Sequence, residues 1–321
     1  MGRAMTSVVS TAIVTVTPNP AVDLSTTVER IVPVHKLRGT SQRRDPGGGG
    51  INVARVVTRL GGDISAIYPA GGSMGALLRG LLDGEGVRSE ALPIAGETRE
   101  DFFVHETSTG QQYRFILPGP RLLENEWRAC LAAVAAQKPF PRFLVGSGSL
   151  PDGVPADFYA QLARIAKQRG ARMILDTSGA ALAAAVTEGV DLIKPNLREM
   201  RELSGSDADT PAAWEVAAKT LVDNGRAGIV ALTMGHLGAA LVTRAGVLRA
   251  KPLAIAPQSA VGAGDSFLGA LVHGLAAGAA PADWFRNAVA AGAAALLNPG
   301  TGLCRPEDVA RLARDVVIER A

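Results

Sequence analysis

Strand-like and helix-like segments alternate along most of this 321-residue chain, and that alternation limits the possible folds more than any other feature. Parallel strands need long crossover connections, which are usually helices, so the alternation predicts an α/β protein. We expect three α/β/α layers with a mostly parallel central sheet. The predicted strands span Val8–Val16, Ser65–Pro69, Phe143–Gly146, Arg172–Leu175, Asp191–Ile193 and Ile229–Thr233. The predicted helices span Asn52–Leu60, Met74–Leu82, Glu124–Ala136, Ala156–Gln168, Ala212–Val222 and Phe267–Ala277.

Composition excludes several classes of protein. Hydrophobic residues make up 47% of the chain, and 33 basic and 30 acidic residues are mixed along it, so there is no basic stripe for nucleic acid. Cys130 and Cys304 lack paired spacing, which argues against a disulfide framework or a zinc site and favours a reducing compartment. Apolar stretches such as Ala288–Leu297 are shorter than the roughly 20 residues that span a bilayer. We expect a cytoplasmic protein that binds neither nucleic acid nor membrane.

Two segments interrupt the alternation. Residues 98–117 contain Phe102, Phe103, a Thr109-Gly110 turn, Tyr113 and Phe115, with the period-2 spacing of a β-hairpin. Together with residues 24–45, this hairpin is predicted to form a small antiparallel β-sheet that covers a site as a lid. The alternative is an edge hairpin that does not move. The predicted core therefore comprises residues 1–23, 46–97 and 118–321.

A glycine-rich turn opens the last predicted helix at Val261-Gly262-Ala263-Gly264-Asp265. Free N–H groups and the helix dipole make such a turn favourable for an anion. A carboxylate beside a bound phosphate would repel it, so Asp265 is predicted to remove a proton from a hydroxyl that attacks the phosphate. The alternative is that Asp265 is an ordinary helix N-cap.

Two further motifs fit the same chemistry. Gly47–Gly50 allows the backbone to approach a ligand closely, and the Asn52 amide that follows can bind a hydroxyl, although a flexible hinge is the alternative. Asn196 and Glu199 stand three residues apart at a helix start, where they can hold a hydrated Mg²⁺ or form a capping box. The P-loop and protein-kinase signatures are absent from the sequence.

The motifs at Pro46–Ala54, Lys194–Glu199 and Gly262–Asp265 occur in the order and at the separations of the ribokinase-like (PfkB) sugar kinases, and the resemblance covers essentially the whole chain. Within this family the sequence resembles the minor bacterial 6-phosphofructokinases. Related 1-phosphofructokinases and tagatose-6-phosphate kinases usually carry a lysine where this chain has Gly49, whereas the Pro18–Val22 segment looks more like the 1-phosphofructokinases. The resemblance implies an ATP- and Mg²⁺-dependent kinase that phosphorylates the 1-hydroxyl of fructose 6-phosphate.

The same resemblance implies roles for individual residues. Asp265 would be the general base, and the amides of Gly262, Ala263 and Gly264 would stabilise the transferring phosphoryl group. The positions that match the sugar-phosphate site are Asp23, Lys36, Arg38, Gly48, Gly49, Gly50, Asn52, Arg99 and Ser149. Those that match the ATP site are Lys194, Asn196, Glu199, Thr233, Gly235 and Gly238, with Asn196 and Glu199 holding Mg²⁺ through water.

Family members often bind a monovalent cation such as K⁺, and many pair their lid sheets into a dimer. The positions that match the cation site are Ser259, Val261, Ala295, Asn298, Gly300 and Gly302, whose carbonyls could instead simply close a loop. A homodimer through the lid would use the aromatic residues of the hairpin, which could equally pack under the lid of a monomer. The alternatives to a 6-phosphofructokinase are a 1-phosphofructokinase, a tagatose-6-phosphate kinase, or a non-catalytic sensor of sugar phosphates or nucleotides.

Overall fold

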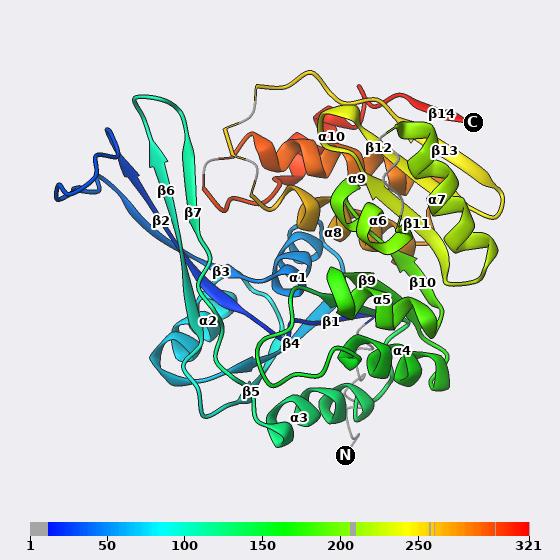
Figure 1. The fold of residues 1–321 in the computed structure, drawn as a ribbon, viewed down its shortest axis with the longest axis horizontal. Helices are drawn as coiled ribbons and strands as arrows, with labels where there is room; N and C mark the ends of the chain where they lie inside the picture. Colours follow the sequence, from blue (N-terminus) through cyan, green and yellow to red (C-terminus); the bar gives the residue numbers. More distant parts are fainter. Residues whose placement is uncertain (1–11, 206–209, 257, 260, 299, 321) are drawn as a thin grey trace, which may run out of the picture.

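The computed structural model describes residues 12–205, 210–256, 258–259, 261–298 and 300–320. Its centre is a ten-stranded sheet in the order β14-β13-β12-β11-β10-β9-β8-β1-β4-β5 (Figure 1). The strands from β11 to β5 in this order are parallel, and β12, β13 and β14 continue the sheet with antiparallel pairing. The strand bounds are β1 Ile13–Val16, β4 Ile64–Ala70, β5 Ser89–Pro93, β8 Phe143–Ser147, β9 Arg172–Asp176, β10 Val190–Ile193, β11 Ala227–Thr233, β12 Ala239–Thr243, β13 Gly246–Ala250 and β14 Ile318–Arg320.

Helices cover both faces of this sheet. Successive residues of β1 enter opposite apolar clusters, Ile13 on one face and Val14 on the other, as strand geometry requires. Helices on the Ile13 face are α1 Gly49–Arg59, α2 Gly72–Gly84, α8 Ala263–Ala276, α9 Pro281–Leu296 and α10 Pro306–Leu312. Helices on the Val14 face are α3 Glu124–Ala135, α4 Phe158–Gln168, α5 Gly179–Thr187, α6 Leu197–Ser204 and α7 Pro211–Asp223. The predicted three-layer fold is confirmed.

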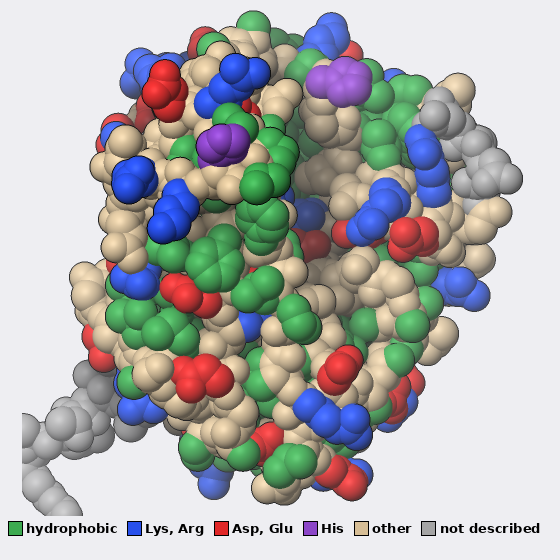
Figure 2. Space-filling model, turned by 60° about the vertical axis from the view of Figure 1, so that its left-hand side comes forward, with side chains coloured by type: hydrophobic (Ala, Val, Ile, Leu, Met, Phe, Trp, Pro, Cys, Tyr) green, Lys and Arg blue, Asp and Glu red, His purple; other side chains and the backbone are tan. Residues whose placement is uncertain are grey.

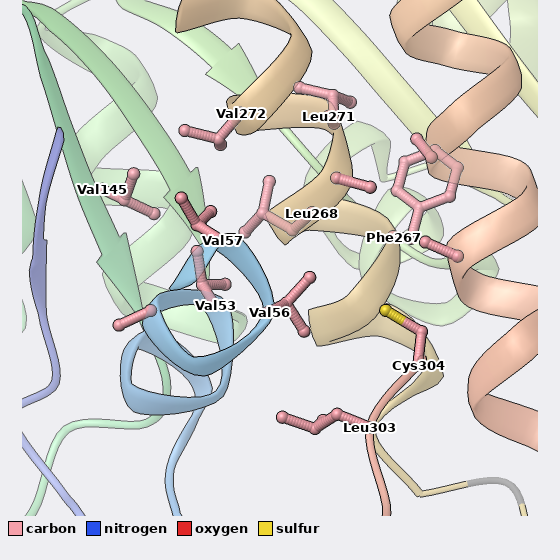
Figure 3. Packing of buried hydrophobic residues seen from close by; sticks show 14 of the residues in the cluster. Val53, Val56, Val57, Val145, Phe267, Leu268, Leu271, Val272, Leu303 and Cys304 are labelled. Atoms are coloured by element: carbon pink, nitrogen blue, oxygen red, sulfur yellow. The ribbon is translucent and has the colours of Figure 1, made fainter. Parts of the chain in front are cut away.

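Helices α1 and α8 pack closely on the same face of the sheet. Figure 3 shows Val53, Val56 and Val57 of α1 beside Leu268 and Val272 of α8. A Cβ atom added to Gly269 would lie 2.6 Å from Val56 Cγ1, so the lack of a side chain at Gly269 permits this approach. The contact brings the N-terminal ends of the two helices together at the same edge of the sheet.

A second, four-stranded sheet projects from the body of the molecule (Figure 1). The predicted β6–β7 hairpin is confirmed, and it pairs Phe102 with Phe115. The β2–β3 pairing is also antiparallel, whereas β2 and β6 are parallel, because both strands leave the core at the same end. The order is β3-β2-β6-β7, with bounds β2 Ala21–Val28, β3 Gln42–Gly47, β6 Arg99–Glu106 and β7 Gln112–Phe115. We call this element the small sheet.

The other predicted elements also occur, with ends that shift by a few residues. The described part of the first strand begins at Ile13, and residues 8–11 of the predicted strand lie outside the described residues. β5, β12 to β14, α5, α9 and α10 were not predicted. All of these except α9 are short segments without a clear apolar period. For α9, sequence analysis noted only the apolar stretch Ala288–Leu297. Cys130 and Cys304 are buried free thiols. Among the described helices, none is long and apolar enough to cross a membrane.

Candidate active site

Most of the predicted site residues meet at one edge of the large sheet. This edge holds the C-terminal ends of β1, β8, β9, β10 and β11, where open α/β sheets bind their ligands. Helices α1 and α8 begin beside this edge. The end of the small sheet that is nearest the core also adjoins this edge. Figure 2 shows a hollow on this side of the molecule, with charged side chains of both signs at its bottom.

Asp265 is the third residue of α8, and the Asn52 amide Nδ2 donates a 2.8 Å hydrogen bond to its Oδ2 atom. The N-cap of the helix is Gly262, in a left-handed conformation with a φ of 74°, so Asp265 is not the N-cap. Burial raises the pKa of the Asp265 carboxyl, and the Asn52 amide and Lys194 ammonium oppose this shift. A half-buried carboxylate therefore lies beside the free N–H groups of a helix start.

An ion pair between a buried lysine and a partly buried aspartate lies next to Asp265. Lys194, just after β10, places its Nζ atom 3.1 Å from Asp176 Oδ1 at the end of β9. A Cβ atom added to Gly264 would lie 3.5 Å from the same Nζ, so the ammonium group adjoins the glycine turn. Burial raises the pKa of Asp176 to about 6, with Lys194 lowering it and Asp265 raising it. Sequence analysis did not single out Asp176, although it directly follows a predicted strand.

The predicted magnesium residues form a capping box at the start of α6. Glu199 N donates to Asn196 Oδ1 at 3.0 Å, and Asn196 N donates to Glu199 Oε2 at 2.9 Å. Burial raises the pKa of Glu199. Among the described residues, no three His, Cys, Asp or Glu side chains are grouped so that they could hold a metal ion.

The remaining predicted ATP residues lie beside this capping box. Asn196 and Thr233 form an isolated parallel bridge, and Thr233 N donates to Pro195 O at 3.0 Å. Gly235 and Gly238 flank the short 3₁₀ helix η1 (Gly235–Leu237) that follows β11. A Cβ atom added to Gly238 would lie 2.1 Å from Ala250 O, so only glycine fits there. Lys194, Asn196, Thr233 and these glycines therefore follow adjacent strand ends.

Three carboxylates lie in one row across the small sheet. Asp23 of β2 pairs with Asp45 of β3 and with Asp101 of β6, so all three side chains project from the same face. Asp23 is only 6% exposed, and burial, with Asp101 beside it, raises its pKa to about 7. A Cβ atom added to Gly47 would lie 2.3 Å from Asp23 Oδ1. The carboxylate of Asp23 is thus held at the base of the small sheet.

The glycine run before α1 is crowded on every side. An added Cβ atom would lie 2.8 Å from Thr17 Cγ2 at Gly48, 2.3 Å from Ser147 Oγ at Gly49 and 2.5 Å from Thr17 Oγ1 at Gly50. Gly49 and Gly50 already belong to α1. These contacts account for the run by close backbone packing at the site, and the hinge alternative is not needed.

Arg99 and Ser149 are joined through Asn19. Arg99 Nη2 donates to Asn19 O at 3.2 Å, and Asn19 Nδ2 donates to Ser149 Oγ at 3.1 Å. Arg99 Nη1 also lies 3.3 Å from Asp101 Oδ2. The guanidinium group is therefore held at the base of β6, in the same region as Asp23.

Lys36 and Arg38 are not brought into this site. Both lie in the exposed connection between β2 and β3, at the outer end of the small sheet (Figure 1). The same loop contains Val34, which is fully exposed. The loop points into solvent, and no described part of the chain folds over it to direct either cation toward Asp265.

The predicted cation-site residues surround the start of α8. Ser259 Oγ donates to Gly300 O at 2.7 Å and accepts from Val261 N at 3.1 Å. Asn298 N donates to Ala295 O at 3.1 Å, and Asn298 Nδ2 donates to Leu303 O at 3.2 Å. These bonds connect the two ends of the loop, and Gly302 lies buried within it. Residues 260 and 299 lie outside the described residues.

Arg114 of β7 is a further charged residue that sequence analysis missed. It pairs with Phe103 across the hairpin, and its guanidinium carbon lies 5.4 Å from the centre of the Phe103 ring. Its charge lowers the pKa of both Asp265 and Asp101, although burial raises both overall. Arg114 therefore faces the site, and the only signal in the sequence was the alternation of the hairpin.

A half-buried carboxylate at a helix start, a lysine beside it and a glycine-rich rim at the end of a parallel sheet define a phosphotransferase site of the sugar-kinase type. The pattern of the pfkB family carbohydrate kinases matches residues 5–308, and the chain belongs to this family. It is 45% identical over 299 residues to the ATP-dependent 6-phosphofructokinase isozyme 2 of Mycobacterium tuberculosis, covering 93% of this chain and 88% of that protein. It is 34% identical over 316 residues to the 1-phosphofructokinase of Rhodobacter capsulatus, covering 96% and 97%.

Solved structures give the same result. The phosphofructokinase-2 of Escherichia coli in complex with fructose-6-phosphate superposes with a TM-score of 0.89 at 38% identity, over 95% of this chain and 99% of that one. Structures of the E. coli enzyme also include a complex with potassium and a tetrameric inhibited form. The resemblance stated from the sequence is confirmed.

The raised pKa of Asp23 predicts a pH-dependent cost to the ligand-free fold. Unfolding returns the pKa from about 7 to 3.8, which corresponds to roughly 4 kcal/mol. Because the folded pKa is raised, this cost is absent below pH 3.8, grows as pH rises and is complete above pH 7. Asp23→Asn should therefore stabilise the protein against urea by more at pH 8 than at pH 5. The matched control is Asp83→Asn on the exposed side of α2, and an equal gain at both pH values would contradict the assignment.

Proposed function

We propose that this protein transfers the γ-phosphoryl group of ATP to the 1-hydroxyl of fructose 6-phosphate. The observation that carries the proposal is the half-buried Asp265 carboxylate at the start of α8, with the Asn52 amide and the Lys194 ammonium beside it. A base, a hydroxyl-binding amide and a cation for phosphate are the groups that such a transfer needs. The higher identity to the ATP-dependent 6-phosphofructokinase isozyme 2 of M. tuberculosis than to the 1-phosphofructokinase of R. capsulatus supports the same reaction.

Asp265 removes the proton of the 1-hydroxyl while the oxygen of that hydroxyl bonds to the γ-phosphorus of ATP. The bond from the γ-phosphorus to the β-phosphate oxygen breaks at the same time, and ADP leaves. The amides of Gly262, Ala263 and Gly264 stabilise the charge on the transferring group. Lys194, Thr233, Gly235 and Gly238 bind the nucleotide. Asn196 and Glu199 would hold Mg²⁺ through water, and this ion would offset the charge of the nucleotide phosphates.

The sugar phosphate lies between the small sheet and the glycine run. Asp23, the Asn52 amide and the amides of Gly48, Gly49 and Gly50 bind its hydroxyls. Arg99 and Ser149 bind its phosphate, because the guanidinium fork of arginine suits phosphate geometry. Arg114 adds positive charge from β7 of the small sheet. We propose that residues 24–45 and 98–117, which include most of the small sheet, close over this ligand as a lid on the core formed by residues 1–23, 46–97 and 118–321.

We further propose a homodimer through the small sheet. Phe102, Tyr113 and Phe115 share the face opposite Asp23, and Phe115 is 52% exposed, whereas Phe103 is buried on the Asp23 face. The exposed loop with Lys36 and Arg38 would then reach the sugar phosphate of the partner subunit. A monovalent cation such as K⁺ would bind at the carbonyl loop formed by Ser259, Val261, Ala295, Asn298, Gly300 and Gly302. Two separate buried thiols suit a cytoplasmic enzyme.

Replacing the proposed base tests the mechanism. Asp265→Asn keeps the size of the side chain but removes its basicity, so kcat should fall by about 10²–10⁴-fold. Calorimetry should show that ATP and fructose 6-phosphate still bind. Asp283→Asn at the start of α9, an exposed helix-start aspartate away from the site, is the matched control. Activity of Asp265→Asn within a few-fold of wild type would remove the proposed base.

A substrate panel tests the specificity. With ATP and Mg²⁺, kcat/KM should be higher for fructose 6-phosphate than for fructose 1-phosphate or tagatose 6-phosphate, because this ratio measures discrimination. The similarity to 1-phosphofructokinases makes fructose 1-phosphate the main competitor. A higher ratio for fructose 1-phosphate would reassign the substrate, and no sugar-dependent release of ADP would favour the sensor.

Mixing two inactive variants tests the dimer. Asp265→Asn lacks the base, and the double variant Lys36→Ala/Arg38→Ala lacks the loop cations. In a mixed dimer one subunit would have its own base and its partner's loop, so an equal mixture that exchanges subunits should regain about a quarter of the wild-type activity. If the subunits are shown to mix and no activity is regained, the loop with Lys36 and Arg38 either serves the site of its own subunit or serves no site.

A further inference from the structure

The side chain of Arg55 is fully buried. Charged side chains are almost never buried unless they have partners. Arg55 lies in α1, one turn after Asn52. Its Nε and Nη2 atoms donate to the two carboxylate oxygens of Glu85 at 2.9 and 2.6 Å. Its Nη1 atom donates to Pro46 O at 2.7 Å and to Asn52 Oδ1 at 3.1 Å. The guanidinium group therefore joins the segment after α2, the glycine run and the proposed site.

The bond to Asn52 fixes the orientation of an amide that contacts the base. A guanidinium group has donors only, so the carbonyl oxygen of Asn52 must face Arg55. The NH₂ group of Asn52 then faces Asp265 Oδ2, to which it donates at 2.8 Å. In the reversed amide, NH₂ would face the guanidinium group and the oxygen would face a carboxylate, and both contacts would be repulsive.

We propose that Arg55 is a positioning residue, which acts on the proposed base through Asn52 and is itself held by Glu85. The hydrogen-bonded series Glu85, Arg55, Asn52 and Asp265 then orients the carboxylate toward the sugar hydroxyl. This inference rests on the kinase function proposed above. Small errors in the position of a reacting group cost up to about 100-fold in rate, so the series has a measurable effect.

The series also affects the titration of the base. Charged groups reach Asp265 from several elements: Lys194 after β10, Asp176 at the end of β9, Arg114 on β7 and Arg55 on α1. The Asn52 hydrogen bond lowers the pKa of Asp265, against the effect of burial. If Asn52 turns away, that stabilisation of the carboxylate is lost and the pKa rises. The acid limb of kcat should then move to higher pH, because the base must be ionised.

A purely structural role, in which Arg55 only ties α1 to Glu85, is the competing explanation, and Arg59 provides the control. Arg59 lies one turn further along α1 and places its Nη2 atom 3.2 Å from Glu85 Oε2. It shares Glu85 with Arg55, but within the described residues it forms no hydrogen bond or ion pair with Asn52. Arg59→Lys therefore disturbs the same carboxylate without disturbing the amide.

The experiment compares Arg55→Lys, Arg59→Lys, Asn52→Ala and the double variant Arg55→Lys/Asn52→Ala. A lysine keeps the charge but cannot bind Glu85, Pro46 and Asn52 together. Arg55→Lys should lower kcat about 10- to 100-fold, change KM for ATP little and move the acid limb to higher pH. Arg59→Lys should stay within about twofold of wild type. In the Asn52→Ala background, Arg55→Lys should lower kcat by less than about threefold, because its effect passes through the amide.

Equal losses in Arg55→Lys and Arg59→Lys, or the same loss from Arg55→Lys with and without Asn52, would overturn the proposal. If Arg55→Lys does not fold, Glu85→Gln replaces it, because this change loosens Arg55 while its bond to Asn52 stays possible. It should give a smaller loss of kcat that likewise disappears in the Asn52→Ala background, and persistence there would overturn the proposal. Absence of kinase activity in wild type would instead refute the proposed function.

Discussion

The close packing of α1 against α8 is the contact on which the site depends. Asn52 and Asp265 are 213 positions apart in sequence, and they meet because the two helices start at the same edge of the sheet and nearly touch at Gly269. Bulkier packing at that point would separate the amide from the carboxylate. The apolar contact between helices and the polar contact between side chains are therefore parts of one arrangement.

Burial of charge is the second feature that organises the site. The Lys194 ammonium partly offsets the cost of burying the Asp176 and Asp265 carboxylates. Asp23 and Asp101 pair on neighbouring strands, and Arg99 lies beside Asp101. The pKa of each of these four carboxyl groups is raised, so the ligand-free site holds its negative charges at a cost. Raised pKa values of this kind are typical of functional sites, where the charged groups are arranged to interact with a ligand rather than to stabilise the fold.

The sequence predicted the layers of the fold well, because buried parallel strands and amphipathic helices have strong periodicities of their own. It also singled out Asp265, Asn52 and Lys194, since glycine-rich turns and the family motifs mark them. Asp176, Arg55 and Arg114 were missed, because each depends on a partner far away in the chain. Lys36 and Arg38 show the reverse: their motif was recognised, but where a loop points is set by the tertiary structure. The mixed pairing of the small sheet was likewise decided by where its strands leave the core.

The parallel pairing of β2 with β6 has a mechanical consequence. Asp23 and Arg99 lie near the ends of these strands that are closest to the core. Phe103, which pairs with Arg114, is four residues beyond Arg99 on β6, or about 13 Å along an extended strand. A tilt of the small sheet about its base would leave the two inner residues almost in place while it swings the outer guanidinium group through a wide arc. In the proposed closure, the small sheet would therefore hold one end of the ligand in place while the other end enters.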